Sequence, residues 1–259
     1  MRPLLILLIV NPFLLFAQEL ATAFPESIPI TEDVVELKQR NFNRGFLPSG
    51  WKSLYQYQNG RLIRQRNYFR GELRLDETYE YTEFPNSLEI KNIYTDKEDY
   101  SLTINYFNDQ RQLIKSEMFF DQDTINPQWV CHNFKYDSVS QQVTFERTNF
   151  YSNSRQRSEC YELKFTNNRL LNRLTFDSCN VITKKESIEF RNNRTVFRTI
   201  DHMDPEVVIL GARSEEGIQR FLYRIDKRGN WTKRYFISSS GMRFLEIKNK
   251  IKYQAHNNR

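Results

Sequence analysis

Residues 54–65 read LYQYQNGRLIRQ, and their pattern indicates the fold class of the chain. Aromatic or aliphatic residues alternate with polar ones up to the turn at Asn59-Gly60, and the alternation resumes from Leu62. Successive side chains of a β-strand point to opposite faces, so the alternation predicts two strands that each have one apolar and one polar face. An Asn-Gly pair readily takes the positive φ angles of a two-residue hairpin turn. The stretch therefore predicts a β-hairpin.

The same arrangement recurs along most of the chain. Alternating runs flank Asn108-Asp109, Asn167-Asn168 and Asn192-Asn193. Turn residues of this kind are spaced 23 to 36 residues apart, near Gly60, Asn86, Asp109, Ser138, Asn168, Asn193 and Gly229. The longest interval contains Glu216-Gly217, which predicts a further turn. Self-similarity of this kind is typical of scaffolds rather than of a single catalytic site.

Strands with one apolar face have to cover that face. Successive hairpins are expected to pair into an antiparallel array, which must then curl, close or pack against a second layer. The sequence thus predicts an all-β fold, an array of antiparallel β-hairpins that forms a large curved sheet, an open barrel or a two-layer sheet. With 20 Phe and 14 Tyr among 259 residues, aromatic packing between strands is expected to supply much of the core.

The beginning of the chain has the layout of a secretory leader. Arg2 precedes an apolar run that Asn11-Pro12 interrupts, which predicts a signal peptide at 1–17 rather than a membrane span. Cleavage after Ala17 is favoured because this residue directly follows the apolar run, and cleavage after Ala23 is the alternative. The leader predicts an exported protein that is periplasmic, associated with the outer membrane, or extracellular.

The remaining chain is predicted to have two parts. Residues 18–50 contain several prolines and glycines and are expected to form a loop and one short helix at 32–41. Residues 51–259 are expected to form the β-hairpin-repeat domain. No transmembrane span is predicted in the mature chain, and peripheral association with a membrane is compatible with this layout.

The charge balance is mildly basic. The chain has 38 Lys and Arg against 32 Asp and Glu, a net charge of +6, and the surplus is spread along the sequence. It gives weak evidence for an acidic partner. A nucleic-acid site would need basic and stacking aromatic residues on one face, whereas here the two types alternate and so point to opposite faces. No nucleic-acid partner is therefore predicted.

Three cysteines would meet an oxidising compartment after export. They allow one disulfide and leave one thiol, and spacing does not choose the pair among Cys131, Cys160 and Cys179. Counting alternation from their aromatic neighbours places all three on the polar face. No Cys-x-x-Cys pair is present, so neither a metal nor a redox centre is predicted.

Few residues could carry catalysis. The only histidines are His132, His202 and His256. Cys131 and His132 are adjacent, so on a strand they point to opposite faces and cannot share a hydrogen bond. His202 and Asp204 would supply two ligands, too few for a metal site. The sequence predicts a non-enzymatic protein without a metal or a cofactor.

The clearest repeat unit lies near the C-terminus, where residues 223–232 read YRIDKRGNWT. This unit resembles the YD repeat of Rhs-type and related bacterial surface proteins, although Ile225 replaces the usual Tyr. The residues that match the pattern of that repeat are Asp226, Gly229, Asn230 and Thr232. Asp226 is expected to accept amide hydrogens of the turn, and Gly229 and Asn230 to supply its special φ angles. The resemblance implies arrays of β-hairpins exported to the cell envelope, often as shells or binding surfaces.

Two functions follow from these observations. The leading hypothesis is a secreted or periplasmic β-hairpin-repeat scaffold that binds a protein or glycan partner. The alternative is a periplasmic carrier that holds a lipid or a small hydrophobic ligand on the apolar face of a curved sheet. The two differ in whether the apolar face is sealed within the fold or left open as a groove.

Overall fold

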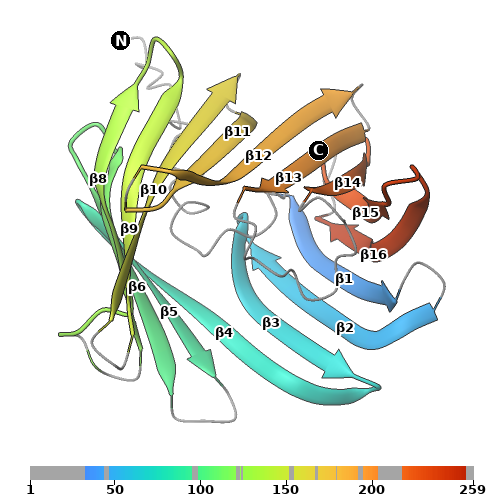
Figure 1. The fold of residues 1–259 in the computed structure, drawn as a ribbon. Helices are drawn as coiled ribbons and strands as arrows, with labels where there is room; N and C mark the ends of the chain where they lie inside the picture. The colour runs from blue at the N-terminus through green and yellow to red at the C-terminus, as the bar shows by residue number, and fades with distance from the viewer. Residues whose placement is uncertain are drawn as a thin grey trace, which may run out of the picture.

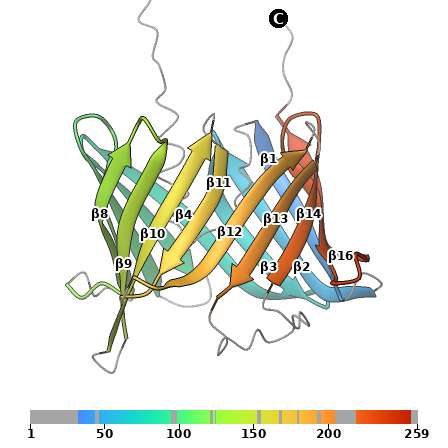
Figure 2. The same cartoon turned by 45° about the horizontal axis from the view of Figure 1, so that its top comes forward.

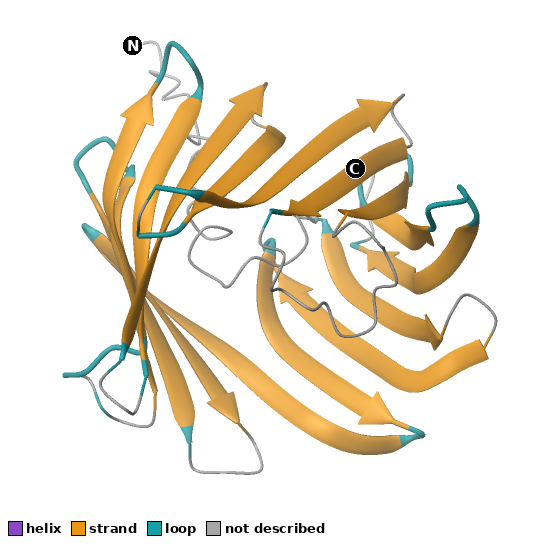
Figure 3. Cartoon of the chain, viewed as in Figure 1, coloured by secondary structure: helices purple, strands orange, loops and turns teal. Residues whose placement is uncertain are grey.

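The chain folds into antiparallel β-strands throughout the part that the computed structural model describes (Figure 3). That part comprises residues 33–254 without 44–46, 95–98, 121–122, 124, 152–154, 167–168, 179, 192–194 and 204–217. The first eight strands are β1 (Val34–Asn43), β2 (Leu47–Gln58), β3 (Arg61–Phe69), β4 (Glu72–Phe84), β5 (Ser87–Tyr94), β6 (Tyr100–Phe107), β7 (Leu113–Phe120) and β8 (Trp129–Asp137). The others are β9 (Gln142–Phe150), β10 (Gln156–Thr166), β11 (Arg169–Phe176), β12 (Ile182–Arg191), β13 (Thr195–His202), β14 (Ile218–Ile225), β15 (Trp231–Ile237) and β16 (Arg243–Tyr253).

These 16 strands form a closed barrel (Figures 1 and 2). Each strand pairs with its sequence neighbours, and β1 also pairs with β16, from Val34 opposite Tyr253 to Asn41 opposite Ile247. Closure pairs both edges of the sheet, which removes the exposed edges that promote aggregation. The all-β antiparallel prediction is confirmed. The expected open barrel, curved sheet or two-layer sheet is wrong, because the first and last strands meet.

The short helix expected at 32–41 is also wrong. Most of this segment is strand β1, which pairs with β2 on one side and with β16 on the other. Val34 and Leu37 are buried there, and the β-branched pair Val34-Val35 suits a strand. The barrel thus starts before the expected boundary at residue 51, while the predicted leader at 1–17 lies outside the described residues.

The predicted turn positions near Gly60, Asn86, Asp109, Ser138 and Gly229 fall in connections between two strands, whereas Asn168 and Asn193 lie outside the described residues. Asn59 and Gly60 have φ angles of 51° and 75°, as a tight hairpin requires. Each of these turns follows an even-numbered strand, so in an up-and-down barrel all lie at one end, which we call the hairpin end. We call the opposite end the loop end. The predicted turn at Glu216-Gly217 lies outside the described residues.

The two faces of the barrel wall differ sharply in burial. On β12, Glu186 and Ile188 are buried, whereas Lys185 and Glu189 are exposed. Nearly all buried residues share the face of Glu186 through the strand register. Side chains converge inside a closed barrel and diverge outside it, so the buried face is the inner one. The outer face carries charged residues.

The apolar core lies along the inner wall as three clusters. The first spans β12 to β16 and includes Tyr223 and Trp231. The second spans β8 to β10 and includes Phe145 and Leu163, and the third spans β5 to β7 and includes Leu113. None of these clusters of described residues joins opposite walls. A closed barrel of this strand number is wide enough to leave space between its walls.

Several strands change from apolar to charged along their inner face. From the hairpin end, the inward residues of β12 are Phe190, Ile188, Glu186 and Lys184, and those of β10 are Phe165, Leu163, Tyr161 and Glu159. Along β9 the order is Val143, Phe145, Arg147 and Asn149. On this part of the wall the interior is therefore apolar near the hairpin end and charged nearer the loop end.

Candidate functional site in the barrel interior

A cluster of charged side chains lies on the inner wall of β10 to β13, and Glu186 is at its centre. The Glu186 side chain is fully buried and accepts hydrogen bonds from Arg198, with Nε–Oε1 and Nη2–Oε2 distances of 2.8 and 3.2 Å. Arg173, also buried, lies 3.5 Å from the same carboxylate. Burial disfavours the charge of Arg198, but Glu186 and Tyr223 outweigh it and raise the pKa of Arg198 above its usual value. The carboxylate of Glu186 is thus matched by two guanidinium groups.

Lys184 is the charged side chain of this wall that is not matched. It lies two residues before Glu186 on the same face, opposite Thr175 and His202. Among the described residues it forms neither a hydrogen bond nor an ion pair. Burial lowers the pKa of Lys184, Glu186 opposes that effect, and Arg173 and Arg198 add to it. Lys184 is therefore a half-buried ammonium group that has no direct ion-pair partner among the described residues, although the carboxylates of Glu186 and Glu159 favour its charge.

Glu159 completes the cluster on the neighbouring strand β10. It accepts a hydrogen bond of 2.6 Å from the hydroxyl of Tyr161 and pairs with Arg157 at 3.2 Å. The cluster, which we call the inner charge cluster, consists of Arg157, Glu159, Arg173, Lys184, Glu186 and Arg198. Four of these side chains are basic and two are acidic. The cluster thus has a positive surplus that an anion would neutralise.

Aromatic surface adjoins the inner charge cluster toward the hairpin end. The rings of Phe134, Phe145 and Tyr161 stack in a row, with 4.9 Å between successive centroids. Tyr223 packs edge-on against Trp231, with ring centroids 5.7 Å apart. A cationic end beside an apolar wall matches a ligand that has an anionic head and an apolar tail.

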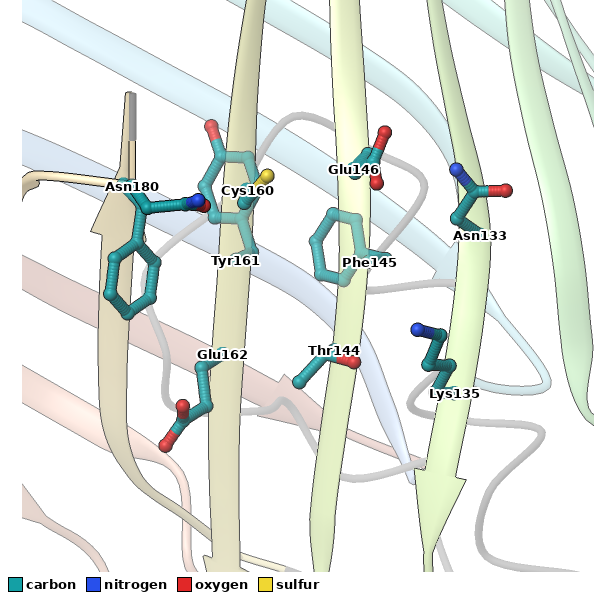
Figure 4. A pocket seen from close by; sticks show the side chains of 10 residues that line it. Asn133, Lys135, Thr144, Phe145, Glu146, Cys160, Tyr161, Glu162 and Asn180 are labelled. Atoms are coloured by element: carbon teal, nitrogen blue, oxygen red, sulfur yellow. The ribbon is translucent and has the colours of Figure 1, made fainter. Parts of the chain in front are cut away.

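The outer face of β8 to β11 has a depression of about 240 Å³ (Figure 4). Lys135, Thr144, Glu146, Cys160 and Glu162 are among the side chains that line it, and Figure 4 shows them on three neighbouring strands. The volume is below the range of about 300 to 1,000 Å³ that is usual for small-molecule sites. Its lining mixes polar and charged side chains with the aromatic residues Phe145, Tyr161 and Phe176. The depression is therefore a weaker candidate than the interior.

His132 lies between Thr148 and Glu146 on the outer face of β8 and β9. Its Nε2 is 3.5 Å from Thr148 Oγ1, and its Nδ1 is 3.9 Å from Glu146 Oε2. This order of groups resembles a nucleophile, a base and an acid, but both distances exceed those of good hydrogen bonds. The geometry does not support acyl transfer here.

One of the two described cysteines lies on the opposite face of the barrel wall from the predicted one. Cys131 was expected on the polar face but is buried on the inner face, because a β-bulge at Asn133, with φ at 57°, shifts the register of β8. Cys160 does lie on the outer face, so Cys131 and Cys160 point to opposite sides of the wall, and both are free thiols. Burial raises the pKa of Cys131 to about 12. Burial and then Glu146 raise that of Cys160. Cys179 lies outside the described residues.

Two other expected features can be placed. Cys131 and His132 point to opposite faces, as the alternation predicts. His202 faces inward beside Lys184, and its pKa is lowered by burial and by that lysine.

No group of metal-binding side chains occurs among the described residues. Within the same part of the chain, no helix is long and apolar enough to span a membrane.

The turn between β14 and β15 contains the residues that resemble a YD repeat. Asp226 accepts hydrogen bonds from the amides of Arg228 and Asn230, at 2.9 and 3.0 Å, and from the hydroxyl of Tyr253 on β16. Gly229 has a φ of 93°. Thr232 donates a hydrogen bond of 3.2 Å to the carbonyl oxygen of Arg224.

Asn230 acts differently from the expectation. It does not have a positive φ, and its side chain is buried and donates to the Tyr253 hydroxyl at 3.2 Å. The turn thus ties β14 and β15 to the last strand of the barrel. Its role in the structure is at the hairpin end, away from the inner charge cluster.

The sequence reasoning missed the inner charge cluster. A signal was present on β12, where Lys184 and Glu186 share the parity of the apolar residues Ile188 and Phe190. A charged pair on the apolar face of a strand has to be matched or bound to something. Arg173 and Arg198 could not be assigned to it before the strand pairing was known.

Comparison with known proteins gives a distant likeness. No protein-family model matches the chain, and no curated protein matches it. Among solved structures, a porin-like protein from Bacteroides uniformis is 12% identical, with 88% of this chain and 100% of that chain covered and a TM-score of 0.36. A TM-score this low carries no argument about function.

Proposed function

We propose that this protein is an exported, non-enzymatic carrier that holds a small amphiphile against the inner wall of its barrel. The observation that carries the proposal is the inward position of both the apolar clusters and the inner charge cluster. Lys184, the unmatched cation, would pair with an anionic head group. The apolar surface around Phe145 and Trp231 would hold the tail.

The orientation of the ligand follows from the change from apolar to charged inward side chains along the strands. Glu159 and Lys184 lie toward the loop end, whereas Leu163 and Ile188 lie toward the hairpin end. An amphiphile in this barrel would therefore have its tail toward the hairpin end. Apolar contact supplies about 0.8 kcal/mol for each buried methylene, so a chain of several methylenes would gain more than the head group alone.

The outer face favours a barrel surrounded by water. Arg64 pairs with Asp76 at 2.6 Å, and Glu80 lies opposite Lys91. A lipid-facing barrel wall is apolar, and an outward Lys or Arg at the centre of a bilayer costs about 2 to 4 kcal/mol. Charged residues on strand after strand of the outer face would make such a position costly.

The scaffold hypothesis receives less support from the geometry than the carrier. A scaffold that bound a protein or a glycan would have to use the outer face and the loops, because the aromatic face is turned inward. The outer depression beside Glu146 is small. A protein or glycan partner stays a prediction from the sequence.

The test is a titration of the full chain, purified without detergent, with two fluorescent probes. A dansyl-labelled undecanoic acid has an anionic head and an apolar chain, and its methyl ester has no charge. We expect both to bind, and the acid to bind more tightly. Lys184→Gln should weaken binding of the acid by about 10- to 100-fold, the value of one hydrogen-bonded charge contact, and leave the ester nearly unchanged.

Two variants control this experiment. Lys184→Arg keeps the charge and should restore binding of the acid. Lys185→Gln removes the neighbouring lysine, which lies on the outer face, and should leave both affinities unchanged. If neither probe binds the wild-type chain, the proposed carrier function is wrong. If both bind but Lys184→Gln and Lys185→Gln act alike, the position of the head group is wrong.

A further inference from the structure

Basic residues lie in a row across the outer face of the last three and first two strands. Arg224 is opposite Lys233, Lys233 is opposite Lys248, Lys248 is opposite Arg40, and Arg40 is opposite Lys52. Directly opposed residues lie on the same face of a sheet and neighbouring strands are about 4.8 Å apart, so the row extends over roughly 19 Å. All of these side chains but Lys233 are exposed.

Further basic residues extend this row into a surface. Lys38 lies opposite Lys250, and Lys252 is the next outward residue of β16. We call the whole surface the basic band, and it comprises Lys38, Arg40, Lys52, Arg224, Lys233, Lys248, Lys250 and Lys252. Glu36 is the acidic residue at its edge, where it pairs with Lys38 at 3.2 Å. Glu36 also lies opposite Lys252, and the other six cations of the band have no carboxylate partner among the described residues.

The basic band is unfavourable for the fold itself. Like charges directly opposite each other on neighbouring strands destabilise a sheet. Elsewhere on the outer face opposite charges are set beside each other, as with Arg66 opposite Asp76 and Glu80 opposite Lys91. An acidic residue could equally lie opposite Lys248, but both of its cross-strand neighbours are basic. A surface that costs stability without an internal partner points to an external one.

The position of the basic band explains why the sequence hides it. The band crosses the seam where β1 and β2 meet β14 to β16, strands from the two ends of the chain that lie side by side (Figure 1). Arg40 and Lys248 are far apart in sequence and opposite each other in space. Basic residues that are far apart in the sequence are thus gathered on one side of the barrel.

A row of apolar side chains adjoins the basic band on the side of the loop end. Phe197, Leu222, Tyr235 and Leu245 are successive partners across β13 to β16 on the same outer face. Leu222 is 1% exposed, while the other three are partly exposed. Aromatic and aliphatic side chains beside lysines are typical of surfaces that rest on the interface of a membrane.

We infer that the basic band docks the barrel on a membrane surface that displays anionic phospholipid head groups. Six of its eight residues are lysines, which act as mobile point charges and suit a fluid layer of phosphates. A specific glycan site would need aromatic platforms with fixed hydrogen-bond partners, and a nucleic-acid site would need rings that can stack between the cations. The basic band has neither arrangement.

The test is sedimentation of the full chain with vesicles, at low and high salt. Vesicles of phosphatidylcholine with phosphatidylglycerol present an anionic surface, and vesicles of phosphatidylcholine alone do not. We expect binding to the anionic vesicles alone, with at least tenfold weaker binding when salt is raised, because exposed charges are screened. The double variant Arg40→Glu with Lys248→Glu should lose binding.

A matched double variant separates the basic band from net charge. Lys164→Glu with Lys185→Glu makes the same change of charge on the outer face of β10 and β12, and it should bind like the wild type. Equal loss in both double variants would overturn the inference, and so would equal binding to both kinds of vesicle. Tight binding of heparin or an oligonucleotide to the basic band, with no binding to anionic vesicles, would overturn the membrane as partner. Circular dichroism is the check that each variant is folded.

Discussion

The inner charge cluster and the basic band arrange charge in opposite ways. Inside the barrel, Glu186 lies between Arg173 and Arg198, and Lys184 is the exception. On the outer seam, Lys248 lies between two other basic residues. A buried charge without a partner is costly, whereas water and salt screen an exposed one. Unmatched charges in this barrel are thus found where a ligand or a membrane surface could supply the counter-charge.

The largest effect is expected at the centre of the inner charge cluster. Glu186→Gln leaves two buried guanidinium groups without their carboxylate, and it should lower the free energy of unfolding by about 3 to 5 kcal/mol. Chemical denaturation measures this loss. Glu189→Gln on the same strand is the control, because its pair with Arg191 at 2.6 Å is exposed and should matter little. Equal losses in the two variants would contradict the contrast between buried and exposed charge.

A smaller loss is expected at the seam beneath the basic band. Asp226→Ala removes the acceptor of two turn amides and of the Tyr253 hydroxyl, and it should cost about 1 to 3 kcal/mol in the free energy of unfolding. Asp137→Ala removes a similar turn acceptor between β8 and β9 that has no contact with a distant strand. It should cost less. The same denaturation experiment decides, and a larger loss at Asp137 would show that the seam contact is unimportant.

Removing a charge from the basic band should raise the free energy of unfolding instead of lowering it. Lys248→Gln relieves repulsion from Lys233 and Arg40, so we expect the free energy of unfolding to rise by about 0.2 to 1 kcal/mol at low salt. The gain should shrink as salt screens the repulsion. Lys164→Gln on β10 is the matched control. A loss of stability at Lys248 would mean that the band stabilises the sheet by itself.

The smallest change in stability is expected on substitution of Lys184. Burial lowers the pKa of Lys184 in the folded protein below its usual value of 10.5, so charging the side chain destabilises the folded state at every pH below that lowered pKa. The penalty fades as pH rises through it and vanishes above 10.5, where the unfolded chain is neutral as well. Lys184→Met should therefore raise Tm slightly at neutral pH, and Lys185→Met should not. A lower Tm for Lys184→Met would contradict an unmatched ammonium group.

The strands and their turns could be predicted from the sequence because both are local. Alternation and Asn-Gly or Asn-Asn pairs act within a few residues, and they placed the turns near Gly60 and Gly229. Closure could not be predicted, because the pairing of Val34 with Tyr253 joins the two ends of the chain. The helix signal at 32–41 failed for the same reason, since the ladder partners of β1 outweigh its local preference.

The functional surfaces depend on register, which the sequence shows poorly. A single bulge at Asn133 reverses the parity of β8 and turns Cys131 inward. The inner charge cluster needs the pairing of β11 to β13, and the basic band needs closure between Arg40 and Lys248. Such sites become visible only after strands that are distant in sequence have been aligned.

The central claim is that the barrel holds an amphiphile inside, with its tail toward the hairpin end. The most direct measurement is quenching of tryptophan fluorescence by a fatty acid that carries bromine at the end of its tail. Trp231 begins β15 at the hairpin end and lies in the inner apolar wall. We predict strong quenching in the wild type and loss of most of it in Trp231→Phe. No quenching, or equal quenching in Trp231→Phe, would contradict the account.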